Sequence, residues 1–180
     1  IHTVLLPDQA RMHLVESATV TEGKDGVIKL RGIGIQGDVK NQNGRIYPKE
    51  EIARAVQEMT QRIQKHGPIP GECDHPDNMT IALERITHLI DAVYMDGTDG
   101  IVEMRVIPTI LGQTVQAMIK CGLKIGVSSR GTGEVDQAGR VSNFEILTID
   151  MVANPSAPDA YPKPVLESLQ GTSNGRRVLN

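Results

Sequence analysis

Residues 86–107 read ITHLIDAVYMDGTDGIVEMRVI, two apolar runs on either side of a turn rich in Asp and Gly. In the second run apolar and charged side chains alternate in the order Val102, Glu103, Met104, Arg105 and Val106. A period of two places the apolar side chains on one face of a strand. We therefore predict a hairpin of strands 86–94 and 101–107, joined by a turn at 96–100, with one buried face.

Helices are predicted on both sides of this hairpin. Upstream, Pro48 fits the first turn of a helix that Gly67 can end. Its apolar positions, at helical spacing, are Ile52, Val56, Met59 and Ile63. Downstream, Thr109 can cap a second helix that ends at Gly122. Residues 68–80 hold several Pro and Gly residues, so we expect a loop there.

Further strands are predicted at residues 27–36, at 127–131 and at 141–153, the last two around a turn at 137–139. Two separate helices interrupt the strands without a regular βαβ alternation. This order favours an α+β fold with a mostly antiparallel sheet or a small barrel.

The chain has 180 residues, enough for one domain with its own core. We expect a loosely ordered N-terminal arm at 1–25, a domain at 26–166 and a disordered tail at 167–180. Ile1 in place of an initiator Met indicates a processed or trimmed chain.

The composition argues against several classes of partner. The formal charge is −3, with no basic block, so no direct binding of nucleic acid or membrane is expected. One Phe, three Tyr and no Trp leave few side chains on which bases could stack. Two cysteines are too few for a disulfide framework, and a reducing intracellular compartment is the simpler expectation.

Three segments carry residue types that suggest chemistry. They place His75 in a Pro-bounded loop, Ser128 at a strand end beside glycines, and Asp150 inside an apolar strand. A serine nucleophile needs a base to take its proton and a third group to orient that base. The chain order His, Ser, Asp matches none of the common triad orders, and Ser128 is not in a G-x-S-x-G elbow.

Structural interpretations compete with each of these candidates. A Ser-Ser pair near a turn usually caps local backbone, and most histidines are surface or hydrogen-bonded groups. Asp150 either turns to solvent or pairs inside the protein, and the pattern does not decide between them. Cys73, His75, His88 and Cys121 are chemically a zinc set, but their spacing does not fit a structural zinc site, and no metal or cofactor is expected.

Four stretches together resemble the prohead core proteases of T-even-type tailed phages. They cover roughly residues 30–161 and occur in the family's order. They are Asn41-Gln42-Asn43-Gly44-Arg45-Ile46-Tyr47-Pro48, Gly71-Glu72-Cys73-Asp74-His75-Pro76, Gly126-Val127-Ser128-Ser129-Arg130-Gly131 and the segment from Ile149 to Ala160.

The resemblance implies a fold like the herpesvirus assemblin proteases, a small, mostly antiparallel β-barrel surrounded by helices. It implies Ser128 as nucleophile, His75 as base and Asp150 as third member, with His88 as the alternative orienter. N–H groups around Ser129 and Arg130 would then receive the oxyanion. Cys73 stands where close relatives are expected to have Leu, a difference that should affect packing alone.

The resemblance also implies a maturation endopeptidase inside the prohead, in the host cytoplasm. Its substrates would be scaffold and major capsid proteins, cut after Glu in an Ile/Leu-x-Glu pattern. The chain would cut itself after Glu16 and, at a near match, after Glu167. Glu103 also fits the pattern, but it lies in a predicted strand and should resist. The resemblance leaves a homo-oligomer open.

Two other function classes compete with this interpretation. One is a non-catalytic capsid-interior or scaffold-binding protein with the same fold. The other is a general serine hydrolase acting on small esters. The intact set of His75, Ser128 and Asp150 argues against the first.

Overall fold

The computed structural model describes residues 25–74, 76 and 78–164. The expected arm (apart from Asp25) and the expected tail therefore lie outside the described residues. The described elements, in chain order, are β1 Ile28–Ile35, α2 Lys49–His66, β2 Ile69–Glu72, η1 Leu83–Arg85, β3 Ile86–Asp96, β4 Asp99–Val106, α3 Ile110–Lys120, β5 Gly126–Val135, β6 Val141–Val152 and β7 Lys163–Pro164.

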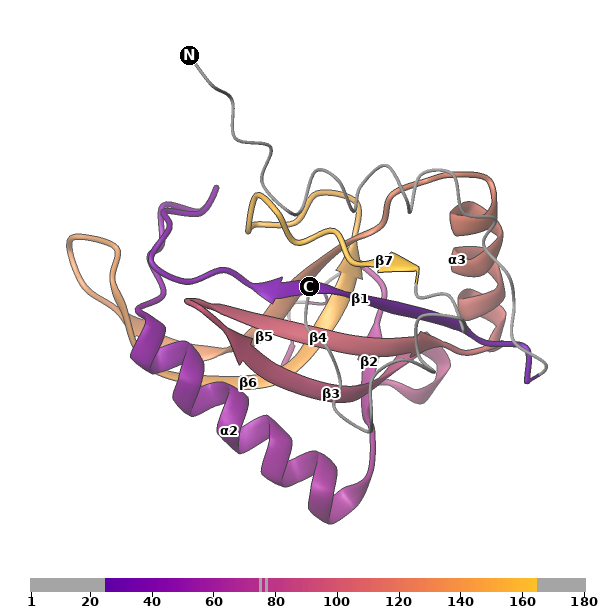
Figure 1. Cartoon of the computed structure of the whole chain (residues 1–180), viewed down its shortest axis with the longest axis horizontal. Coiled ribbons are helices and arrows are strands. Elements are labelled where there is room, and N and C mark those ends of the chain that lie inside the picture. Colours follow the sequence, from indigo (N-terminus) through magenta and orange to yellow (C-terminus); the bar gives the residue numbers. More distant parts are fainter. Residues whose placement is uncertain (1–24, 75, 77, 165–180) are drawn as a thin grey trace.

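The predicted hairpin is confirmed as β3 and β4, which pair antiparallel at the centre of the larger sheet (Figure 1). The turn is tighter than expected, because Asp96 and Asp99 already pair and Gly97 takes a positive φ of 62°. The alternation correctly predicted the buried face. Its side chains are at most 2% exposed: Val102, Met104 and Val106.

The described strands form two open sheets, one of order β2-β3-β4-β1-β7 and one of β5 and β6. The expected α+β fold with mostly antiparallel strands is confirmed, and the described strands do not close into one barrel. The two sheets approach closely at Gly34 of β1, where an added Cβ would lie 3.1 Å from Ile149 Cδ1 of β6. A larger residue at position 34 would require the side chains of Val102 and Ile149 to shift.

The loop predicted at residues 68–80 is wrong in its first part, because Ile69–Glu72 forms β2 and pairs with β3. Tertiary pairing overrides the low strand propensity of Pro70 and Gly71. Gly71 is required at this position, since an added Cβ would lie 2.1 Å from His88 Nε2.

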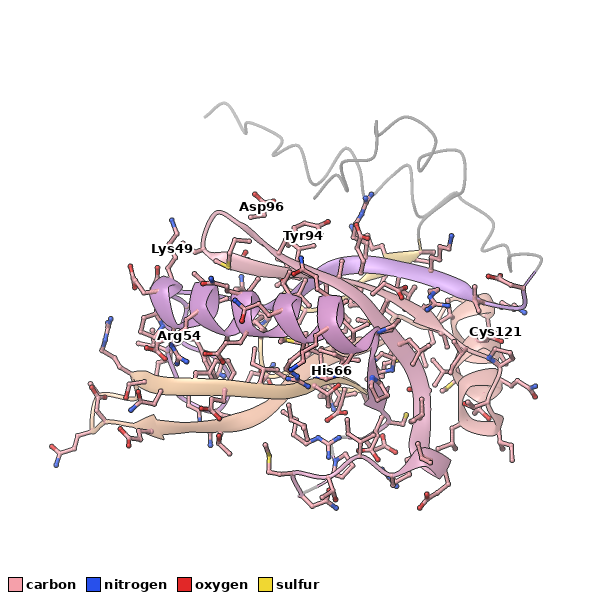
Figure 2. All side chains as sticks on the ribbon, turned by 90° about the horizontal axis from the view of Figure 1, so that it is seen from below. Lys49, Arg54, His66, Tyr94, Asp96 and Cys121 are labelled. Atoms are coloured by element: carbon pink, nitrogen blue, oxygen red, sulfur yellow. The ribbon has the colours of Figure 1, made fainter. Side chains whose placement is uncertain are left out.

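The two helices begin and end close to the predicted positions. Pro48 stands just before α2, and the Thr109 side chain caps α3 by accepting from Gly112 N at 2.9 Å. Arg54 lies on the side of α2 that faces the β5–β6 hairpin, where it donates to Phe144 O at 3.0 Å (Figure 2). In the part of the chain described here, neither helix has the length and apolar character of a membrane span.

Candidate active site

The β5–β6 pair brings two of the predicted site residues together. Ser128 and Asp150 are direct partners across the two antiparallel strands. Direct partners project their side chains from the same face of a sheet. Ser128 is 8% exposed and Asp150 is fully buried, so a hydroxyl near the surface stands beside an enclosed carboxylate.

A segment after β6 covers the beginning of β5 and contributes a second hydroxyl. Val127 N–H donates to Ala160 O at 2.8 Å. Gly126 permits close approach, since an added Cβ there would lie 2.5 Å from Pro155 Cδ. As a result Ser156 Oγ lies 3.2 Å from Ser128 Oγ. The motif containing Ser156 was noted in the sequence, but its contact with Ser128 was not foreseen.

The segment that leads into the histidine motif runs beside β6. Asp74 N–H donates to Met151 O at 2.9 Å, and Cys73 forms a parallel bridge with Met151. Met151 is adjacent to Asp150 in the sequence. His75 itself lies outside the described residues, so its predicted contacts with Ser128 and Asp150 stay predictions.

Asp150 is paired inside the protein, which decides the alternative that the sequence left open. Its Oδ1 accepts from Glu72 N–H at 3.1 Å and from a terminal nitrogen of Arg130 at 3.2 Å. Arg130 Nε lies 2.8 Å from Asp150 Oδ2, but its N–H is not directed at that oxygen. This last contact is therefore an ion pair without hydrogen-bond alignment.

The two oxyanion candidates differ in the direction of their backbone. Val127 N–H points away from β6, so strand alternation directs Ser129 N–H to the same outer edge and Arg130 N–H toward β6. This favours Ser129 as the donor to a bound carbonyl. The Arg130 side chain is engaged with the carboxylates of Glu72 and Asp150, a role that sequence reasoning missed.

His88 is a fully buried residue on β3 with both ring nitrogens in contact. A carbonyl oxygen can only accept, so Nε2–H donates to Ile149 O at 2.8 Å. In the neutral ring Nδ1 then accepts from the Thr87 hydroxyl at 2.8 Å. Burial lowers the pKa of His88 from 6.5 to about 4, which keeps the ring uncharged at neutral pH.

This shift predicts an acid sensitivity of the fold. Between pH 6.5 and about 4 the unfolded chain protonates His88 and the folded chain does not, so the free energy of unfolding falls as the pH falls. The total loss is about 3 kcal/mol, present in full only below the folded pKa. The free energy of unfolding, measured with urea at a series of pH values, should change less with pH in His88→Gln than in the unchanged chain. An equal pH dependence of the free energy of unfolding in the two proteins would contradict the lowered pKa of His88.

Three of the four residues of the zinc alternative, Cys73, His88 and Cys121, are among the described residues. Cys121 is exposed at the end of α3 (Figure 2), and burial raises the pKa of the half-buried Cys73 thiol. Across residues 25–74, 76 and 78–164, no group of three or more His, Cys, Asp or Glu side chains is placed to hold a metal ion.

A serine opposite a buried carboxylate, beside the segment that carries a histidine, is the arrangement of a candidate serine-hydrolase site. The family model for prohead core protein serine protease matches residues 8–170. This chain therefore belongs to the prohead core protein serine protease family, which makes it a peptidase; the family name implies the serine type.

A relative and a solved structure agree with that membership. The chain is 32% identical over 161 residues to the prohead core protein protease of Enterobacteria phage T4, covering 82% of this chain and 76% of that protein. Among solved structures, the capsid assembly protease of bacteriophage T4 matches with a TM-score of 0.64 and 26% identity. That match covers 69% of this chain and 80% of the other.

Proposed function

We propose that this protein is the maturation serine endopeptidase of a phage prohead. The observation that carries the proposal is the pairing of Ser128 with the buried Asp150, in a chain of the prohead protease family. The peptidase would act inside the prohead, in the host cytoplasm, on scaffold and major capsid proteins. A likeness to the herpesvirus assemblin proteases and a homo-oligomeric state stay parts of the proposal.

The proposed reaction follows serine protease chemistry. Ser128 Oγ attacks the scissile carbonyl while His75 takes the hydroxyl proton. The C–N bond then breaks, and the same proton passes from His75 to the leaving amine. Asp150 holds the imidazole in the required tautomer, and Ser129 N–H donates to the oxyanion. Water then attacks the acyl-enzyme and gives a proton to His75. The ester bond to Ser128 breaks, and His75 returns the proton to Ser128 Oγ.

A peptide of this chain's own residues 10–21, ARMHLVESATVT, tests the proposal directly. We expect cleavage between Glu16 and Ser17, seen by mass spectrometry as a product that ends in Glu. A non-catalytic scaffold-binding protein would leave the peptide intact. A general hydrolase would consume small esters and also leave it intact.

Self-cleavage should discriminate between acidic sites. We expect cuts after Glu16 and after Glu167, both outside the described residues, and none after Glu103. Glu103 lies on β4 with strand partners on both sides, Arg31 of β1 and Ala92 of β3. A protease binds an extended and accessible segment, which this central strand offers only after local unfolding. Intact-mass analysis after long incubation tests this, with Ser128→Ala as the inactive control. Fragments that end at Glu103 would count against the proposal.

A further inference from the structure

The side chain of Arg130 is 4% exposed and joins three parts of the chain. One terminal nitrogen donates to the backbone oxygens of Asn78 at 2.9 Å and Thr80 at 3.2 Å. The other donates to the Glu72 carboxylate and to Asp150 Oδ1 at 3.2 Å. Arg130 therefore contacts β2, β6 and the segment between β2 and η1 at once.

These contacts lie on both sides of His75 in the sequence. Glu72 stands three residues before His75, and Asn78 stands three residues after it. Arg130 also follows Ser128 by two residues on β5, so the two side chains project from the same face of the strand. One guanidinium thus links the strand of the nucleophile, the strand of the acid and the described flanks of the histidine motif.

The charges of this cluster balance, yet they are costly to bury. Glu72 is 1% exposed and Asp150 is fully buried, and Arg85 Nε approaches Glu72 Oε1 at 3.7 Å as a second cation. Burying such ions costs about as much free energy as their attraction returns, and apolar residues of similar volume are often as stable. A contribution to the stability of the fold therefore does not explain why these charged residues are buried together. The planar guanidinium instead supplies fixed directions for its hydrogen bonds.

We propose that Arg130 is a positioning residue of the active site. It holds Asp150 and the described flanks of the histidine motif at a set distance from Ser128, and it does so without contacting the substrate. This inference rests on the proposed protease function and assigns a role to the side chain of Arg130, separate from its backbone.

The test compares Arg130→Met and Arg130→Lys with the unchanged chain. The readouts are kcat and KM on the peptide of residues 10–21, the thermal midpoint, and the rate at which a fluorophosphonate probe labels Ser128. For Arg130→Met we expect kcat to fall roughly 10²-fold, the effect of a misplacement of about 1 Å, with KM little changed. Arg130→Lys keeps the charge but lacks the planar guanidinium, so it should recover part of kcat.

Arg62 provides a matched control on α2. It also donates to backbone oxygens of β6, to Ile146 O at 2.6 Å and Leu147 O at 2.8 Å, on a part of the strand away from Ser128. Arg62→Met should lower the thermal midpoint and leave kcat unchanged. If Arg130→Met does not fold, Glu72→Gln removes the charge on β2 while Arg130 keeps Asp150 as its partner, and kcat should still fall roughly tenfold.

Two results would overturn the inference in distinguishable ways. If the unchanged chain is active and Arg130→Met folds and keeps full kcat, Arg130 is a structural residue only. If Arg130→Met does not fold, full kcat in Glu72→Gln leads to the same conclusion. An unchanged chain that neither cuts the peptide nor reacts with the probe would instead overturn the proposed protease function.

Discussion

Ser128→Ala is expected to lower the rate of peptide cleavage by roughly 10⁴- to 10⁶-fold, because it removes the atom that we propose forms the acyl-enzyme. The fold should persist. The Ser128 hydroxyl contacts Ser156 Oγ at 3.2 Å near the surface, and losing such a contact costs about 1 kcal/mol. Initial rates on the peptide of residues 10–21, together with a thermal melt, measure both effects.

Ser129→Ala is the control for this experiment. Ser129 is adjacent on β5, its side chain projects from the opposite face, and its proposed role uses the backbone N–H alone. It should retain most of the activity. If both variants lost activity equally, the nucleophile would be wrongly assigned.

Asp150→Asn should have the second largest effect, lowering kcat by roughly 10²- to 10⁴-fold, less than Ser128→Ala. An amide has no charge and one acceptor oxygen. If that oxygen keeps the place of Oδ1 and accepts from Glu72 and Arg130, the NH₂ takes the place of Oδ2 and faces Nε of the guanidinium, where the ion pair is lost. Breaking a buried ion pair on one side costs about 3–5 kcal/mol, and Glu72 as a remaining partner favours the lower end. Urea unfolding and kcat report the two effects separately.

Thr148→Val separates these two effects. Thr148 is a fully buried residue two positions before Asp150 on β6, and its hydroxyl donates to Pro70 O at 2.7 Å. The variant should lose about 1–2 kcal/mol of stability and keep its kcat. A fully active Asp150→Asn would exclude Asp150 from the mechanism.

The elements defined by short-range patterns were predictable. The β3–β4 hairpin followed from an alternation of period two, and α3 followed from the cap at Thr109 and the glycine at 122. Both signals lie within a few residues of the structure they specify. β2 was missed because Pro70 and Gly71 oppose a strand locally, and its pairing with β3 overrides them.

The candidate site likewise has a part that the sequence predicted and a part that it did not. The motifs around Ser128 and Asp150 identified the candidate residues, because each motif is continuous in the chain. The pairing of those residues and the contacts of Arg130 with Glu72 and Asp150 join positions 20 to 58 residues apart. Whether the carboxylate in an apolar strand faces water or an arginine depends on which segment packs against it. Strand register and sheet packing set that contact, and the local sequence of β6 carries no signal for it.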